Sequence, residues 1–287
     1  MLERDGYPQG VPCWVDTSQP DPEAAVEFYG GLFGWEFEDR MPADAPGNYF
    51  VATIRGKDVA AIGSQQEGSP PQPFWSTYVW VESADEAAAK AKEAGGSVLA
   101  EPFDVMQAGR MAVLADPQGA PISVWQAGTH RGAQLVNEPG TWNFSALNTG
   151  DVAGARDFYG AVFGWQADPI DLGQGESNMW RLPGYGDYLE QRDPGLRARM
   201  GDQGAPPGFE DVVAWLMPLN GSAPDASPHW DVTFAVDDAD AAAAKATDLG
   251  GKVLAPPMDA PFVRFTVLSD PQGAVFTASK YVPPGSE

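Results

Sequence analysis

The chain repeats itself over most of its length. Three phrases each occur twice: EFYGGLFGWEF and DFYGAVFGWQA (27–37 and 157–167), VESADEAAAKAKEAGGSVLAEP and VDDADAAAAKATDLGGKVLAPP (81–102 and 236–257), and ADPQGAPISVWQ and SDPQGAVFTASK (115–126 and 269–280). A repeat on this scale is typical of a duplicated domain. The sequence therefore predicts two copies of one fold, and any candidate residue can be compared with its counterpart in the other copy.

The second copy is longer than the first. Phe28 and Phe158 are separated by 130 residues, whereas Asp116 and Asp270 are separated by 154. We place the extra residues at about 170–225, which is rich in Gly, Pro and Asp and has no sustained period. This stretch is predicted to be a long loop with room for one short helix. Such loops often form lids or binding loops, and a plain surface insertion is the equal alternative.

Each copy is predicted to contain a strand, a helix and three strands, twice over. In the first copy, apolar and polar residues alternate over 11–18 as in a β-strand. Asp21 is a suitable cap for a helix that begins at Pro22. Gly34 is a suitable end for that helix. The Asp-Pro-Gln-Gly at 116–119 predicts a tight turn between two later strands, with its aspartate as a turn-former.

The repeats divide the chain into three parts. Domain 1 covers residues 9–128, a linker covers 129–140, and domain 2 covers 141–282 with the insertion at about 170–225. The linker is polar and ends in Pro-Gly. In a chain of 287 residues, each domain is large enough for us to expect a core of its own.

Composition limits the partners and the compartment. The formal net charge of −23 argues against nucleic acid and anionic membranes, because phosphate groups would be repelled. We find no run of 18 apolar residues and no signal-peptide pattern, and the single Cys13 fits a reducing compartment. We therefore expect a cytoplasmic protein that binds a small molecule. It would be a monomer by internal duplication or a loose homodimer.

The phrases at 20–37, 79–96 and 109–126, with their second copies, resemble the vicinal oxygen chelate superfamily. This superfamily includes glyoxalase I, bleomycin-resistance proteins, fosfomycin-resistance enzymes and extradiol dioxygenases. The resemblance implies an α+β fold of four βαβββ units, which form two cupped mixed sheets with helices outside. Residues 184–197 and 208–216 make the chain more similar to actinobacterial two-domain glyoxalase-like proteins.

The resemblance also implies where a divalent metal would be bound. Enzymes of the superfamily use His, Gln or Glu on the first strand of each unit and on the last strand of the second unit. The matching positions here are Trp14, Ser76 and Ser123 in domain 1, and Phe144, Asp231 and Thr277 in domain 2. Most of these side chains are poor metal ligands. The two histidines, His130 in the linker and His229 in domain 2, are too few to complete a set of metal ligands. We therefore expect neither a metal nor a cofactor.

The first functional hypothesis is a binding module similar to bleomycin-resistance proteins. Aromatic side chains would contact a flat ligand, and a few polar groups would orient it. The candidate ligand-binding residues are Trp14, Asp16, Ser76, Tyr78, Trp80, Arg110, Ser123, Trp125, Phe144, Trp180 and Thr277. The acidic composition favours a neutral or cationic aromatic metabolite or antibiotic as the ligand.

The second hypothesis is an enzyme: a glyoxalase-like lyase or isomerase, or a hydroxylase- or oxygenase-type tailoring enzyme acting on a small carbonyl or aromatic polyketide-like substrate. The catalytic candidates are His229 and Asp231, which share one face of a strand, and Arg264 as an oxyanion holder. The alternative for Arg110 and Arg264 is a salt bridge with Glu101 or Asp259. Asp16 is a further candidate base if it is buried. Because the insertion lies in domain 2, we expect domain 2 to be the active copy.

Overall fold

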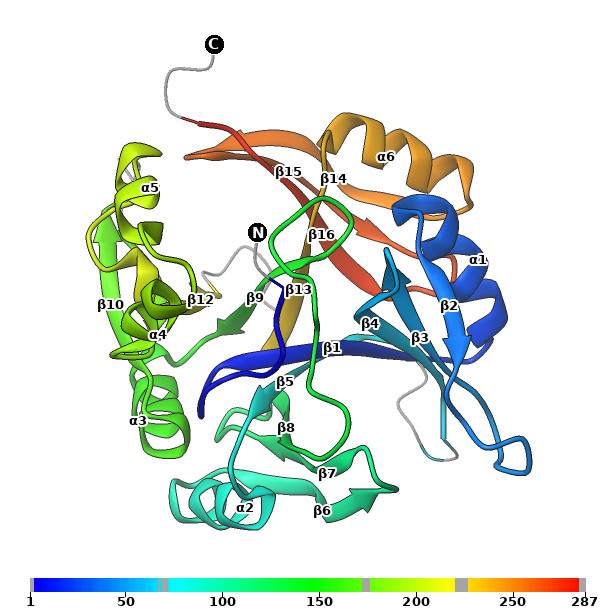
Figure 1. Cartoon of the computed structure of the whole chain (residues 1–287), viewed down its shortest axis with the longest axis horizontal. Coiled ribbons are helices and arrows are strands. Elements are labelled where there is room, and N and C mark those ends of the chain that lie inside the picture. The colour runs from blue at the N-terminus through cyan, green and yellow to red at the C-terminus, as the bar shows by residue number, and fades with distance from the viewer. Residues whose placement is uncertain (1–2, 67, 69–71, 172–175, 220–226, 284–287) are drawn as a thin grey trace.

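The structure is a computed structural model that describes residues 3–66, 68, 72–171, 176–219 and 227–283. It contains two eight-stranded sheets, one from each copy (Figure 1). The strands of the first sheet are β1 (Pro12–Gln19), β2 (Glu36–Asp39), β3 (Tyr49–Ile54), β4 (Lys57–Ser64), β5 (Trp75–Trp80), β6 (Ser97–Val105), β7 (Gly109–Ala115) and β8 (Pro121–Ala127). The strands of the second are β9 (Trp142–Thr149), β10 (Gln166–Asp171), β11 (Glu176–Arg181), β12 (Val212–Pro218), β13 (His229–Ala235), β14 (Lys252–Ala260), β15 (Val263–Ser269) and β16 (Val275–Tyr281).

The strand order is the same in both sheets. In the first sheet it is β2-β3-β4-β1-β5-β8-β7-β6, and in the second it is β10-β11-β12-β9-β13-β16-β15-β14. Each sheet joins two βαβββ units along an antiparallel pair, β1 with β5 and β9 with β13. The first strand of each unit is parallel to the last, as β1 is to β4 and β5 to β8. The predicted α+β fold of four βαβββ units is confirmed.

Local capping rules set the helix limits. The helices are α1 (Pro22–Phe33), α2 (Ala84–Glu93), α3 (Val152–Phe163), α4 (Tyr185–Arg192), α5 (Leu196–Asp202), a 3-10 turn η1 (Phe209–Asp211), and α6 (Ala239–Asp248). The Asp21 side chain accepts the Ala24 N–H at 3.0 Å, and α1 ends at Gly34, whose φ is 73°. Helix α3 repeats this arrangement with Asp151 and Gly164. Both ends of α1 thus lie where the sequence predicts them.

The hydrophobic core is shared between the two copies. Helix α1 packs against α6 of the second copy, and α2 packs against α3 (Figure 1). Phe28 and Tyr29 of α1 belong to the same buried cluster as Phe234 and Phe276 from β13 and β16. The expectation of one core per domain is therefore wrong. The helical face of each copy is apolar because the other copy covers it.

Matched hydrogen bonds connect the copies across this core. The Tyr29 hydroxyl donates to Asp270 Oδ2 at 3.1 Å, and the Tyr159 hydroxyl donates to Asp116 Oδ2 at 3.3 Å. Burial raises the pKa of both aspartates. The other oxygen of Asp116 accepts backbone N–H groups of its own turn, the nearest from Gln118 at 2.9 Å. The predicted turn-forming role is confirmed, with an interdomain contact added to it.

The insertion of domain 2 lies between β11 and β12. It contains α4, α5 and η1, which is more helix than the one short helix that the sequence suggested. The predicted stretch at about 170–225 also includes the strands β11 and β12. In domain 1 the equivalent strands β3 and β4 are joined through Arg55 and Gly56 alone. Tyr185 of α4 is buried, which could not be predicted from the pattern of residues in this stretch. No helix among the described residues is long and apolar enough to cross a membrane.

Candidate functional site

The cup of domain 1 is filled by its own side chains. The strand register places Trp14 beside Tyr78, and Tyr78 beside Ser123. Asp16 and Trp125 lie on the same face of the sheet, and all five side chains are buried. Ser76 pairs with Asp16 in the register and is half-buried. These predicted residues therefore come together, but little of their surface is open to a ligand.

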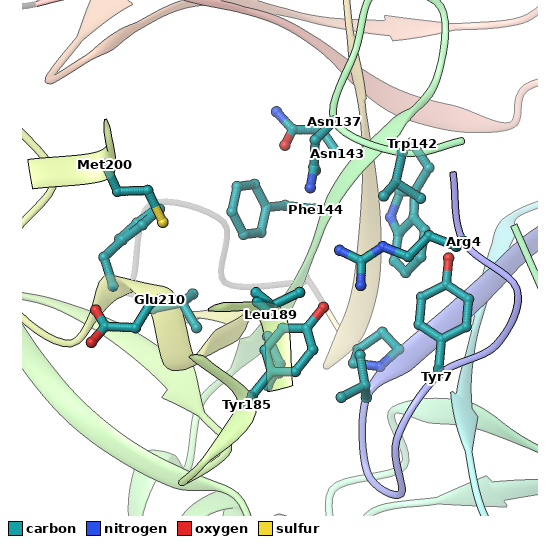
Figure 2. Close-up of a pocket in the computed structure, with 16 residues that line it drawn as sticks. Arg4, Tyr7, Asn137, Trp142, Asn143, Phe144, Tyr185, Leu189, Met200 and Glu210 are labelled. Carbon is teal, nitrogen blue, oxygen red and sulfur yellow. The ribbon is translucent and has the colours of Figure 1, made fainter. Parts of the chain in front are cut away.

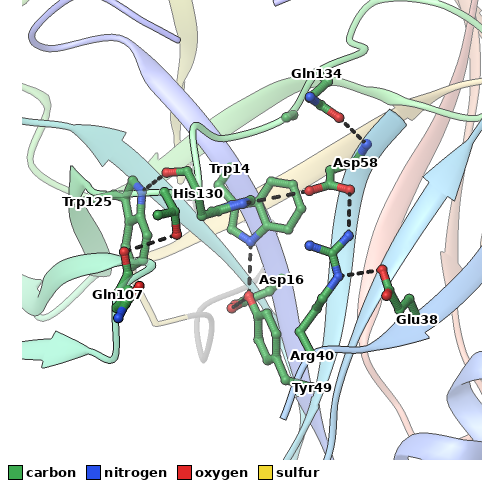
Figure 3. A network of polar contacts seen from close by, with 12 residues as sticks. Trp14, Asp16, Glu38, Arg40, Tyr49, Asp58, Gln107, Trp125, His130 and Gln134 are labelled. Carbon is green, nitrogen blue, oxygen red and sulfur yellow. Dashed lines mark hydrogen bonds and ion pairs between the residues drawn. The ribbon is translucent and has the colours of Figure 1, made fainter. Parts of the chain in front are cut away.

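Asp16 is the central polar group of this cup. Its Oδ2 accepts hydrogen bonds from the Tyr49 hydroxyl at 3.0 Å and the Tyr78 hydroxyl at 2.9 Å. The Trp14 indole N–H donates to the Tyr49 hydroxyl at 3.1 Å (Figure 3). Burial raises the pKa of the Asp16 carboxyl to about 6, and the hydrogen bonds from Tyr78 and Tyr49 oppose this rise only in part. Tyr49 was not among the sequence candidates.

The raised pKa makes a prediction for stability. Asp16 ionises less readily in the folded chain than in the unfolded chain, whose ordinary value is 3.8. Its stabilising contribution is therefore complete below about pH 4 and is lost as the pH rises through 6. Relative to Asp16→Asn, the free energy of unfolding should fall by about 3 kcal/mol between about pH 4 and pH 7. Urea denaturation of both proteins across this range measures the difference, and a difference independent of pH would contradict the assignment.

The linker closes the cup of domain 1. The His130 ring lies edge-on to Trp14, with centroids 4.4 Å apart, and also contacts Trp125 (Figure 3). The Trp125 indole N–H donates to the His130 carbonyl oxygen at 3.0 Å. Burial lowers the pKa of His130 to about 4, and Arg40 adds to this effect, so the ring is neutral near pH 7. The sequence predicts a polar linker here, and the structure shows that this histidine of it folds back onto the sheet.

The cup of domain 2 is more open. The register places Phe144 beside Thr233, and Thr233 beside Thr277. Further along β13, His229 Nε2 is 3.4 Å from Asp231 Oδ1, and their side chains are 45% and 33% exposed. Asp16, the acidic group of the other cup, is 7% exposed. The hydrogen bond with Asp231 raises the pKa of His229.

The two predicted arginines lie on the wrong face of their strands for a ligand site. Met111 pairs with Trp125, so its neighbour Arg110 lies on the opposite face and reaches Asp85 of α2 at 2.8 Å. Arg264 makes the matching contacts with Asp240 and Asp259, at 2.5 Å and 2.9 Å. The salt-bridge alternative holds for Arg264 with the predicted partner Asp259. For Arg110 the partners are Asp85 and Asp104, and Glu101 pairs with Lys92 instead.

Two predicted tryptophans have other surroundings. Trp180 is fully buried in an aromatic cluster with Tyr159 and Trp165, on the face of β11 opposite the cup. It packs the shared core. Trp80 is half-buried, and the guanidinium of Arg131 lies over its ring, 5.4 Å from the centroid.

A cavity of about 120 Å³ lies at one side of the domain 2 cup (Figure 2). Phe144 is the predicted site residue that lines it. Helices α4 and α5 and the turn η1 form one wall, and the N-terminal segment forms another. The lining residues are Arg4, Tyr7, Val11, Pro12, Val136, Asn137, Trp142, Asn143, Phe144, Tyr185, Leu189, Met200, Phe209, Glu210, Val212 and Val213. The cavity is thus mostly apolar and aromatic, with a small number of polar groups.

The cavity was mostly missed by sequence reasoning. The repeats point to strand residues, whereas Arg4 and Tyr7 precede the first repeat. A signal was nevertheless present in the insertion, because Tyr185 and Leu189 have helical spacing in a stretch that only domain 2 contains.

Comparison with known proteins agrees with this architecture. The family model described as the Glyoxalase/Bleomycin resistance protein/Dioxygenase superfamily matches residues 14–124, and the model of a glyoxalase-like domain matches residues 145–279. The protein named "Putative glyoxylase CFP32" from Mycobacterium tuberculosis is 41% identical over 288 residues, which cover 99% of both chains. The chain belongs to the glyoxalase/bleomycin resistance/dioxygenase superfamily. The resemblance drawn from the sequence is confirmed.

Other relatives broaden the range of functions in the superfamily. The anthracycline biosynthesis protein DnrV from Streptomyces peucetius is 35% identical, over 94% of this chain and 93% of its own. Among solved structures, the Mn(II)-bound glyoxalase from Novosphingobium aromaticivorans superposes with a TM-score of 0.59 at 16% identity, covering 95% of this chain and 82% of its own. The similarity to that structure concerns the fold alone.

The metal positions of the superfamily do not suit a metal here. A divalent ion needs three or more donors such as imidazole or carboxylate. Trp14 and Phe144 supply none, and Ser123 and Thr277 supply weak hydroxyls. Within the part of the chain that the structure describes, no group of three His, Cys, Asp or Glu residues is arranged to hold an ion. His229 and Asp231 together supply two donors, fewer than a divalent ion needs. The chemistry of these side chains therefore does not fit the metal of the superfamily's enzymes.

Proposed function

We propose that the protein binds a small aromatic molecule in the cavity of domain 2, without using a metal at the superfamily's ligand positions. The cavity itself is the observation that carries this proposal. Its wall combines aromatic rings with a few polar side chains, as small-molecule sites do. The duplication supports it as well, because the equivalent cup of domain 1 is filled by Trp14, Trp125 and His130.

Phe144 provides the direct test. Its ring lies within the cavity, with Phe209 and Trp215 at 6.3 Å and 6.0 Å between centroids (Figure 2). Phe144→Ala should weaken the binding of single-ring aromatics about tenfold or more, because burying a phenyl ring contributes about 1.5–3 kcal/mol. Calorimetric titration with phenol, benzamide and benzoate measures the effect. Trp14→Phe, at the counterpart position in the filled cup, is the matched control and should leave binding unchanged.

Two outcomes would reject this function. In one, none of the three aromatics binds to the unaltered protein. In the other, Phe144→Ala and Trp14→Phe weaken binding equally. Equal effects would indicate a general loss of stability or a site in domain 1, and a urea denaturation of each variant separates these explanations.

A second candidate function is a tailoring enzyme that moves a proton on a carbonyl or aromatic polyketide-like substrate. The observation in its favour is the buried Asp16 carboxyl between two tyrosine hydroxyls, with a pKa of about 6. The relative named for anthracycline biosynthesis agrees with this class of substrate. The domain 1 cup would have to open at His130 to admit it. Turnover that Asp16→Asn abolishes and Asp231→Asn retains would favour this function over simple binding.

A further inference from the structure

The cavity of domain 2 has a cationic side chain, Arg4, in its wall. Figure 2 shows the Arg4 guanidinium beside the cavity, with the Tyr185 hydroxyl pointing toward it. Arg4 is held there by its own backbone, whose N–H donates to the Gln134 carbonyl oxygen at 2.9 Å. Among the described residues that line the cavity, Arg4 is the one cation.

The partners of Arg4 within the protein are neutral. Its guanidinium lies over the Tyr7 ring at 5.5 Å from the centroid. Burial raises the pKa of Tyr185, and the nearby Arg4 charge opposes that rise, so the phenol stays protonated near pH 7. Within the described residues, no carboxylate forms an ion pair with Arg4. Most other arginines of the chain do form such an ion pair.

The acidic side chain of the cavity lies away from Arg4. Glu210 is at the opposite side in Figure 2, and its Oε1 is 3.3 Å from the Arg197 Nε. An anionic group at the Arg4 end would therefore meet a cation, a phenol hydroxyl and the amide of Asn143. Guanidinium and amide groups are strong donors for a carboxylate.

The size of the cavity limits the rest of the ligand. An apolar cavity of about 150 Å³ holds one benzene molecule, and the volume here is about 120 Å³. The cavity therefore has room for at most one aromatic ring. A larger ligand would extend toward the open cup, where Thr233 and Thr277 follow Phe144 in the register.

We propose that the cavity selects an aromatic acid, with its carboxylate at Arg4 and its ring against Phe144. This selection rests on the proposed binding function and adds the class of ligand to it. It departs from the neutral or cationic ligand that the overall charge of the chain favours. The overall charge acts at long range and is screened by salt, whereas Arg4 contacts the ligand directly.

Benzoate and benzamide test the proposal, because they share one shape and differ in charge at pH 7. In calorimetric titrations at about 0.15 M salt, which screens the long-range repulsion by the acidic chain, benzoate should bind about tenfold more tightly than benzamide, and acetate should not bind measurably. Arg4→Met should abolish the preference, because benzoate loses more affinity than benzamide when the cation is removed. Arg131→Met is the matched control, because Arg131 also lies over an aromatic ring but outside the cavity. It should retain the preference.

The outcomes separate the two proposals. Equal binding of benzoate and benzamide, or a preference that survives in Arg4→Met, would overturn the selection of an acid and leave the aromatic site in place. Failure of every aromatic to bind would overturn both proposals. If Arg4→Met does not fold, Arg4→Gln, which is also uncharged but keeps a polar side chain, takes its place. Its preference for benzoate should likewise disappear, and a preference that survives in Arg4→Gln would reject the role of Arg4.

Discussion

Expressed alone, residues 1–135 are expected to show no cooperative unfolding transition, and the same is expected of residues 136–287. Each half would expose the helical face that the other half buries in the native chain. For the first half this face includes Phe28 and Tyr29, which pack against Phe234 and Phe276. Large apolar side chains contribute about 1.5–3 kcal/mol each when buried, and a whole domain is stable by only about 5–15 kcal/mol.

Near-ultraviolet circular dichroism and urea titration of each half, and of the two mixed, measure this effect. The mixture should recover the aromatic signal and a single transition, because the interface between the halves is the core itself. A half that unfolds cooperatively on its own would show that the shared core is dispensable. The two copies would then be independent domains, as the sequence suggested.

The second large effect is expected in the insertion. Replacing residues 183–207 by a short Gly-Ser turn, similar to the Arg55-Gly56 connection of domain 1, should reduce the binding of aromatics about a hundredfold. The replacement removes α4 and α5, and with them Tyr185, Leu189 and Met200 from the cavity wall. The sheet should persist, because β11 and β12 still pair. Calorimetric titration measures the affinity.

A milder variant guards against misfolding in this experiment. Leu189→Ala with Met200→Ala removes apolar surface from the cavity and leaves both helices in place. It should weaken binding about tenfold. Affinity that is unchanged in both variants would make the insertion a surface feature, which was the alternative at the level of sequence.

The fold was predictable from the sequence to a large extent, because its determinants are local and occur twice. The caps Asp21 and Asp151 and the terminating glycines Gly34 and Gly164 obey short-range rules, which the structure confirms. The face of the sheet on which Arg110 lies could also have been predicted once Met111 is paired with Trp125. Side chains alternate between the two faces of a strand, so Arg110 lies on the helix side of the sheet.

The site was less predictable, because it depends on contacts between segments far apart in the chain. His130 lies in a polar stretch that suggests a linker, yet its ring fills the cup against Trp14. Arg4 and Tyr7 have no counterpart in the repeat and reach the cavity only when the N-terminal segment crosses to domain 2. Trp180 is of a residue type that often stacks on ligands. It is buried instead because Tyr159 and Trp165 pack against it.

The account rests on the claim that domain 2, and not domain 1, holds the ligand. A crystal structure of the protein soaked with benzoate tests it most directly. We expect one molecule, with its ring against Phe144 and its carboxylate within hydrogen-bonding distance of Arg4. The account would be contradicted if benzoate were bound beside Asp16 and Trp14 in domain 1 and no benzoate were bound in the cavity of domain 2.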